Sequence, residues 1–321
     1  MDLIYADEKL EDIGVLKDYS LDLAYGSNEN DFELCMNLKD ACLQSGYVIY
    51  ADGTEYGGVV DEIQIKSESK EIKYIGRTWQ GVLAERIIEP DAGSDYLILS
   101  GKITSIINIL IRRIGLQDFF YATDQGSDDT VVTFQFDRYV TVYEGITKML
   151  SQYQKKVKFV FIDCRVNLQI DDIIDYSKSD DYYSIGTEYE IDKKYNYVNH
   201  LICLGKGELK DRQVIHLYAD KDRNIRKYQT FFGLDEITEI YDYSSADSVE
   251  TLESEGVKKF KDLIADAQSS VCVKNEMQFG IGDIVSAWDE TTNTSVYGTV
   301  TKKIIALTDK RISIEYKIGD E

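Results

Sequence analysis

The spacing of apolar residues predicts β-structure in the N-terminal part of the chain. Between 32 and 38, apolar side chains alternate with polar ones, which is the period of a strand with one buried face. Asp52-Gly53 separates two apolar arms in the manner of a hairpin turn. The polar residues 67–71 separate two further arms. We therefore expect a meander of four to six antiparallel strands that ends near Arg77.

Helical spacing replaces this alternation in the middle of the chain. The elements predicted there are a helix over 78–89, a helix over 103–116, a strand over 130–139, a helix over 140–153 and a hairpin over 156–170. The first helix stops before Pro90, the only proline in the chain. For the second we expect Ser100 as the cap and Gly115 near the end. Residues 91–178 are therefore expected to form a small α/β module inserted between β-rich parts.

Strands resume after the acidic link 177–184, and one amphipathic helix is predicted at about 245–268. Near its start, Asp247 and Glu250 have the spacing of a capping box. Its apolar stripe consists of Val249, Leu252, Val257, Phe260, Leu263 and Ile264. The chain ends in another antiparallel meander.

The two β-rich parts share a sequence pattern. Tyr56–Ile63 has the sequence YGGVVDEI, and Tyr297–Ile304 has YGTVTKKI, with Tyr, Gly, Val and Ile at the same spacings. Each segment follows a glycine and a turn-rich stretch, and each precedes a similar ending, EIKYIG at 71–76 and IEYKIG at 314–319. The pattern favours a duplicated β-unit, one copy at each end of the chain.

Composition and charge limit the class of protein. The 321 residues are 43% hydrophobic and 12% aromatic, which is typical of a chain that folds. No apolar run reaches the roughly 18 residues of a membrane helix, and the acidic N-terminus lacks the features of a signal peptide. We expect a protein that stays in the cytoplasm unless a larger assembly carries it out, with no membrane binding of its own.

The net charge of −22 argues against a free-standing nucleic-acid binder, because phosphate contacts need Lys and Arg. Two interpretations remain open. The charge maintains solubility, or it forms a surface that must not adhere to a polyanion close by.

Motifs for catalysis or metal binding give no positive signal. The five cysteines are scattered without a C-x-x-C pair or a nearby histidine, so we expect reduced, mostly buried thiols and no zinc site. His200 and His216 lie in alternating strands with no carboxylate or cysteine partner by spacing, which favours structural roles. A carboxylate pair leaves almost no sequence signature and stays open. We name no catalytic, cofactor-binding or metal-binding residue.

Three short motifs are interpreted as structural. In 205–212 a strand follows the Gly-x-Gly pair where a phosphate loop needs a helix, so this is a hairpin turn. In 219–231 Asp220 begins a pattern like that of a calcium loop, but Ile225 occupies the place of the required glycine, which favours a turn. GRTWQG at 76–81 marks a corner between strand and helix, with Trp79 in the core.

Several segments resemble a family of phage tail proteins, the baseplate or tail hub proteins of the siphovirus ReqiPepy type. That family is similar to the late control gene D and XkdQ hub proteins of contractile tails and phage-like particles. The segments that carry the resemblance are 76–101, 136–150, 195–209, 216–220, 231–243 and 282–319. They occur in the same order and cover most of the chain.

The resemblance implies an α+β, mainly β fold with two similar antiparallel β-barrel domains, like those of tail tubes, and an inserted α/β module. The expected domains are a first β-barrel at 1–90, the α/β module at 91–178, and a second β-barrel at 179–321 that includes the amphipathic helix. In this family three copies form a ring whose six barrels imitate sixfold symmetry.

The resemblance also implies a function. The chain is expected to be a virion structural protein, a trimeric baseplate hub of a phage or prophage, assembled in the bacterial cytoplasm and located in the virion tail. Its partners would be a hexameric tail tube or distal tail protein and a spike or fibre protein, with DNA only in transit through an acidic channel. No enzymatic activity is expected. The alternatives are a module that binds host-surface carbohydrate and a cell-wall hydrolase.

Overall fold

The computed structural model describes residues 2–27, 29–124, 130–178, 189–192, 196–265, 270–273, 278–289, 291–308 and 311–319. The chain divides into two compact units. The larger comprises Met1–Glu190 and Val271–Gly319, and the smaller comprises Ile191–Ser270. Within the described ranges, no helix combines the length and the apolar character that crossing a membrane requires.

The N-terminal part is antiparallel as expected, but it has seven strands where four to six were predicted. Its strands are β1 (Ile4–Ala6), β2 (Asp12–Val15), β3 (Tyr19–Gly26), β4 (Asp31–Asn37), β5 (Val48–Tyr50), β6 (Gly57–Lys66) and β7 (Glu71–Thr78). It is not a simple meander, because β4 pairs with β7 and β5 pairs with β1. Buried and accessible side chains alternate along β4 and β7, as the sequence pattern predicts. Phe32, Leu34 and Tyr74 are almost fully buried and lie in the core of this part.

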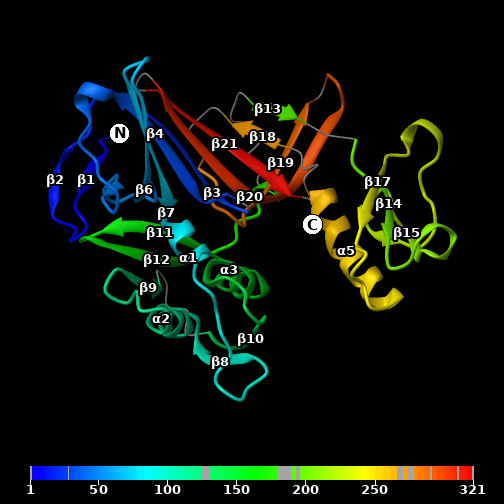
Figure 1. Ribbon diagram of the computed structural model, residues 1–321. Coiled ribbons are helices and arrows are strands. Elements are labelled where there is room, and N and C mark those ends of the chain that lie inside the picture. The colour runs from blue at the N-terminus through cyan, green and yellow to red at the C-terminus, as the bar shows by residue number, and fades with distance from the viewer. Residues whose placement is uncertain are drawn as a thin grey trace. The chain divides into compact units, whose positions relative to one another are not determined.

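Helix α1 (Trp79–Ala84) leads into the α/β module and ends earlier than the predicted 78–89. The elements of the module are β8 (Leu97–Lys102), α2 (Ile103–Arg113), β9 (Phe120–Asp124), β10 (Val131–Phe136), α3 (Val142–Gln152), β11 (Lys155–Ile162) and β12 (Arg165–Asp172). The predicted elements occur in the expected order, and β8 and β9 are strands that the pattern did not predict. Figure 1 shows the module on one side of the N-terminal strands. The prediction of Ser100 as a helix cap is wrong. Ser100 lies inside β8, where its hydroxyl is 2.8 Å from that of Thr133, because β8 pairs antiparallel with β10.

The C-terminal part adds β13 (Tyr189–Asp192), β18 (Ser270–Val273), β19 (Ile284–Asp289), β20 (Thr294–Thr308) and β21 (Arg311–Gly319). These strands and the N-terminal ones form one sheet in the order β13-β18-β21-β20-β3-β4-β7-β6-β5-β1-β2, with β19 also paired to β20. This arrangement does not show the two separate barrels that the resemblance implies, because no sheet of the described strands closes on itself. The physical reason is that β20 pairs with β3, so the two β-units use these edges to join each other.

The two β-units share a hydrogen-bond framework. Gly46 N–H donates to Val60 O at 2.8 Å, and Gly282 N–H donates to Val300 O at 2.8 Å. Both glycines have positive φ, 86° and 96°, which suits glycine at a tight entry into a strand. Each framework contains one bulge, at Asp61 in β6 and at Thr301 in β20. Val60 and Val300 are therefore equivalent positions.

This equivalence corrects the alignment of the repeated sequence. Gly58 pairs with Ile49 in β5, and Gly298 pairs with Val285 in β19, so these two glycines match each other. A Cβ at Gly58 would lie 2.1 Å from the carbonyl oxygen of Arg77, and one at Gly298 would lie 2.3 Å from that of Gly319. The predicted duplication is thus confirmed as a repeated architecture, but the matching residues are shifted by one position.

A buried tyrosine supports each copy in the same way. The Tyr316 hydroxyl accepts a hydrogen bond from Phe279 N–H at 3.2 Å, and the Tyr74 hydroxyl accepts one from Leu43 N–H at 3.4 Å. Each donor lies three residues before the positive-φ glycine of its copy. The hydroxyls thus fix the turn that leads into β5 or β19.

Removing these hydroxyls tests the framework. Tyr316→Phe is expected to lower the free energy of unfolding by roughly 1 kcal/mol, because a buried N–H loses its acceptor. Tyr74→Phe should lower the free energy of unfolding less, since the hydrogen bond from Leu43 N–H to the Tyr74 hydroxyl is longer. Urea unfolding followed by tryptophan fluorescence measures both effects, with the exposed Tyr228→Phe as control. Equal stability of Tyr316→Phe and the unsubstituted protein would contradict the prediction.

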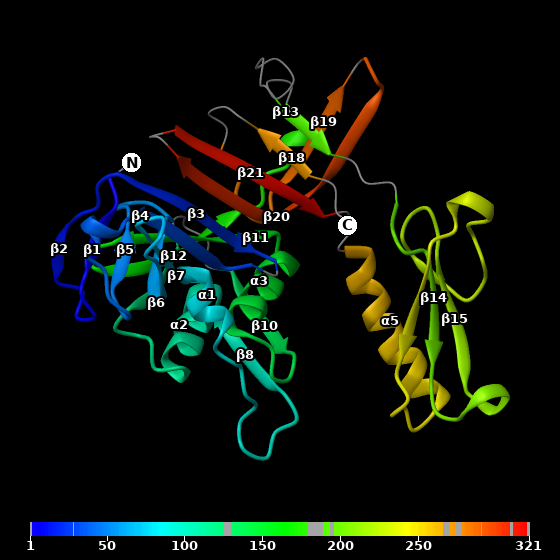
Figure 2. The same cartoon turned by 45° about the horizontal axis from the view of Figure 1, so that its top comes forward.

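The smaller unit is a four-stranded sheet with one helix. Its strands are β14 (His200–Leu204), β15 (Val214–Ala219), β16 (Ile225–Arg226) and β17 (Thr238–Asp242), in the order β16-β15-β14-β17. The predicted amphipathic helix is α5 (Val249–Ala265), which lies along β14 and β15 (Figure 2). Leu252, Phe260 and Ile264 are buried there, while Val249 is 42% exposed.

The start of α5 differs from the predicted capping box. Thr251 N–H donates to the Ser248 hydroxyl at 3.2 Å, so the residue after Asp247 provides the cap. Serine is as good a cap as aspartate, and spacing alone does not distinguish two neighbouring polar residues.

Candidate functional site

The two β-units meet at a buried ion pair between β20 and the turn before β6. Lys303 pairs with Glu55, and their side chains are 2% and 14% exposed. Lys303 belongs to the C-terminal copy and Glu55 to the N-terminal one. Two opposite charges at this depth must neutralise each other, because either one alone would remain desolvated. The pair therefore links the two copies of the repeat.

Tyrosine side chains surround this pair. The Lys303 ammonium lies 5.5 Å from the ring centre of Tyr56 and 5.8 Å from that of Tyr316, within the range of cation–π attraction. Burial, followed by the charge of Glu55, raises the pKa of Tyr25 and of Tyr56 above the usual value of a phenol. These two hydroxyls stay protonated at neutral pH, so they add no further charge beside the ion pair.

A cavity of about 190 Å³ lies beside the ion pair, within the larger unit. Its lining includes Tyr25 of β3, Gln80 of α1, Tyr143 of α3 and Lys156 of β11. Gln80 Oε1 is buried there without a hydrogen-bond partner in the protein. A cavity of this size with an unsatisfied polar atom is suited to several ordered waters. Its lining comes both from the repeated sheet and from the α/β module.

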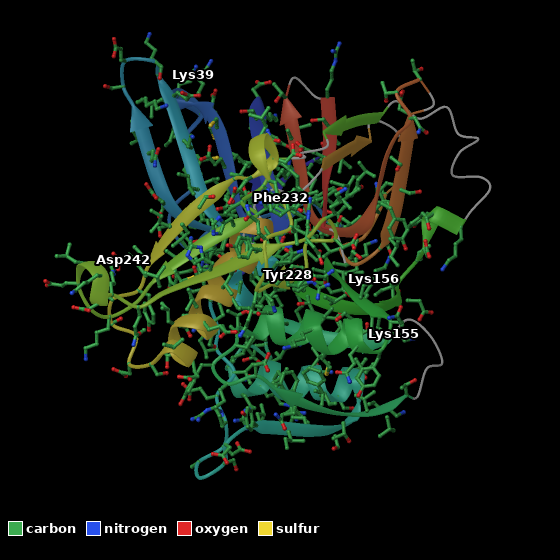
Figure 3. The ribbon with its side chains drawn as sticks, turned by 90° about the vertical axis from the view of Figure 1, so that its right-hand side faces the viewer. Lys39, Lys155, Lys156, Tyr228, Phe232 and Asp242 are labelled. Atoms are coloured by element: carbon green, nitrogen blue, oxygen red, sulfur yellow. The ribbon has the colours of Figure 1, made fainter. Side chains whose placement is uncertain are left out.

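A second buried charge pair fixes the C-terminal copy to the module. Lys156 pairs with Asp283, whose side chain is fully buried. Asp283 also accepts hydrogen bonds from Ile174 N–H at 2.9 Å and Gly280 N–H at 2.7 Å. The neighbouring Lys155 pairs with Asp172 across the hairpin of β11 and β12, and Figure 3 labels both lysines.

The sequence patterns did not identify the Lys303–Glu55 pair. One signal was present: Lys303 lies in phase with Ile305 and Leu307, which are both buried in the same strand. A lysine at an apolar position of an alternating strand indicates a buried partner. The identity of that partner, 248 residues away in sequence, could come only from the tertiary structure.

The two histidines are brought together in the smaller unit. His200 Nε2 lies 2.8 Å from His216 Nδ1, and His200 Nδ1 lies 2.7 Å from Glu236 Oε1. Spacing along the strands showed no carboxylate partner for either histidine, and the partner of His200, Glu236, lies 36 residues away in the sequence. The Tyr218 ring stacks on His200 at 4.4 Å between ring centres. These contacts orient His200 within the sheet.

The short motifs have the expected structural roles. Residues 205–212 form the turn between β14 and β15, with Gly207 at φ 108°. Asp220 accepts hydrogen bonds from Asp222 N–H and Asn224 N–H and pairs with Arg226, which closes the turn between β15 and β16. Trp79 is fully buried at the corner between β7 and α1.

No group of three or more His, Cys, Asp or Glu side chains within the described residues is placed to hold a metal ion. Of the four cysteines described as free, Cys203 is buried, Cys35 and Cys42 are partly accessible, and Cys164 is exposed. The expectation of mostly buried thiols does not hold for these four, because Cys203 alone among them is buried, and the side chain of Cys272 lies outside the described residues. Cys164 lies in the tight turn between β11 and β12.

Large apolar side chains are exposed in both units. Tyr228, Phe232 and Leu234 of the smaller unit are 65%, 66% and 102% exposed, and Figure 3 labels the first two. In the larger unit, Ile63 and Ile65 of β6 are 39% and 61% exposed. Sequence alternation places these isoleucines on one face of a strand but does not tell whether that face is covered.

Comparisons with known proteins concern the fold. No protein-family model and no curated protein matches the sequence. The 43 kDa tail protein of prophage MuSo2 from Shewanella oneidensis has a TM-score of 0.51 and 12% identity, over 100% of this chain and 98% of its own. Prophage tail protein gp18 from Listeria monocytogenes EGD-e has a TM-score of 0.50 and 12% identity, over 100% and 95%. The tail protein from Neisseria meningitidis MC58 has a TM-score of 0.49 and 12% identity, over 100% and 96%.

Proposed function

We propose that the chain is a structural component of a phage or prophage tail, a trimeric hub that connects the hexameric tail tube to the tail tip or spike. The observation that supports this most is the likeness in fold to the prophage tail proteins from Shewanella and Listeria, along the whole of both chains. The role is one of assembly and assigns no catalytic residue.

The repeated β-unit supports the threefold part of the proposal. A chain with two equivalent units presents six of them in a trimer, which matches a hexameric tube on one side and a trimeric spike or fibre on the other. The net charge of −22 suits a ring that encloses the DNA exit channel, because acidic walls repel phosphate. DNA would be a molecule in transit and not a ligand.

Two measurements test the proposal. Light scattering behind a sizing column is expected to show a species near three times the chain mass of 36.7 kDa at several protein concentrations. Mass spectrometry of tail particles purified from the bacterium that encodes the chain should find it in the tail fraction. Absence of the chain from purified tails would contradict the tail role. A stable dimer would contradict the threefold hub.

A further inference from the structure

The order of strands in the large sheet contains the same series twice. The C-terminal copy contributes β13-β18-β21-β20, and the N-terminal copy contributes β3-β4-β7-β6. The fourth strand of the first series, β20, pairs with the first strand of the second series, β3. Among the described strands, no strand pairs with the outer edge of β13, and none pairs with the part of β6 that corresponds to the β3-facing part of β20.

The distal half of β6 is the counterpart of the part of β20 that β3 covers. In β20, Lys302–Leu307 pair antiparallel with Gly26–Leu21. With the bulges at Asp61 and Thr301 aligned, the corresponding residues of the N-terminal copy are 62–67. On this side of β6, β5 pairs only with Gly57–Val59. Among the described strands, none pairs with residues 62–66 on that side.

Exposure of equivalent side chains gives an independent observation. Lys303 and Ile305 of β20 are 2% and 1% exposed, next to Tyr25 and Leu23 of β3. Their counterparts in β6, Ile63 and Ile65, are 39% and 61% exposed. Natural proteins usually protect an edge strand with charges, proline or a cover. Here two isoleucines occupy the positions that the other copy buries.

We propose that the distal half of β6, Glu62–Lys66, is an interface that takes β13 of a second copy of this chain as an antiparallel neighbour. The occupant is a second copy because the same sheet already contains this junction once, as β20 with β3. The contact is heterologous, so each copy uses β6 toward one neighbour and β13 toward the other. Closure of these contacts at three copies rests on the proposed function, whereas the pairing of the two edges does not.

A proline in β6 tests the edge without removing its pairing to β7. Ser27 N–H donates to Thr301 O, so by alternation the backbone groups of Lys303 and Ile305 face β3. The N–H groups of Ile63 and Ile65 accordingly face the open edge. Ile65→Pro removes one of these donors and obstructs the approach of a strand. It is expected to raise the concentration at which the oligomer dissociates by about tenfold or more.

Two control variants separate the edge from the side chain and from proline itself. Ile65→Thr changes the side chain but keeps the N–H, so it should weaken the oligomer less than Ile65→Pro does. Val15→Pro places proline in β2, which lies at the other end of the sheet order from β13. Val15 is 50% exposed, and this variant should leave the oligomer unchanged. Far-UV circular dichroism verifies that each variant is folded, and light scattering at several concentrations gives its mass.

A trimeric unsubstituted chain with a folded, monomeric Ile65→Pro variant supports the pairing. A trimer that Ile65→Pro leaves intact overturns it while the threefold hub stands, and a chain that is monomeric at every concentration also overturns it. In that last case the tail role is still decided by the chain's presence in purified tails. Open filaments that Ile65→Pro abolishes support the pairing and contradict closure at three.

Discussion

Glu55→Leu is expected to lower the free energy of unfolding of the larger unit by about 3–5 kcal/mol. The substitution leaves the Lys303 ammonium buried without its carboxylate partner, in surroundings where its side chain is only 2% exposed. The tyrosine rings around it offer cation–π attraction of about 2 kcal/mol in a desolvated site, which is less than the several kcal/mol that burial of an unpaired charge costs. The loss should therefore exceed that of any exposed salt bridge in the chain.

Urea unfolding followed by tryptophan fluorescence measures this effect, because Trp79 and Trp288 both belong to the larger unit. The control is Glu33→Leu, which removes the partner of Lys73 in a pair whose carboxylate side chain is 49% exposed, and should cost about 1 kcal/mol or less. The double variant Glu55→Leu/Lys303→Met should regain most of the stability, since it removes both charges. Equal losses for Glu55→Leu and Glu33→Leu would show that the buried pair does not hold the two copies together.

Trp79→Ala is expected to cost about 3–5 kcal/mol of stability, through lost burial and the cavity that it leaves. Trp79 is fully buried and stacks on Phe161 of β11 at 5.3 Å between ring centres, with Phe119 at 5.6 Å. Its ring joins the corner after β7 to the α/β module. The variant should therefore increase local opening of the α/β module as well as lower the free energy of unfolding of the larger unit.

Circular dichroism during urea unfolding gives the loss of stability without dependence on the removed fluorophore. Hydrogen exchange should show faster exchange in β11 and α2 of the variant than of the unsubstituted protein. Trp79→Phe keeps an aromatic ring and should lose clearly less, and the exposed Tyr96→Ala should stay within about 0.5 kcal/mol. Faster exchange confined to residues beside position 79 would contradict the role of Trp79 in holding the module.

Periodicity predicted most secondary structure because it records burial residue by residue. The alternation at 32–38 became β4, and the apolar stripe at 245–268 became α5. The cap residues were less predictable. Ser100 and Asp247 are good caps by type, but pairing of β8 with β10 and the neighbouring Ser248 determined the actual helix starts.

The repeated sequence predicted a duplicated unit but not its exact matching of residues. Identical letters aligned Gly57 with Gly298, whereas hydrogen bonds and bulges match Gly58 with Gly298. Side chains in a strand alternate with period two, so a shift of one residue exchanges the two faces. The positions of the isoleucines in β6 relative to Lys303 and Ile305 could be assigned only after this correction.

The sequence by itself determined the elements, the duplication, the amphipathic helix and the strongly acidic charge, because these follow from local spacing and composition. The tertiary structure decided what pairs with what: β20 with β3, Lys303 with Glu55, and His200 with Glu236. The reason is physical. A strand's pattern specifies which face is buried, but its backbone donors and acceptors are the same at every residue, so the neighbouring strand is selected only when the whole chain packs.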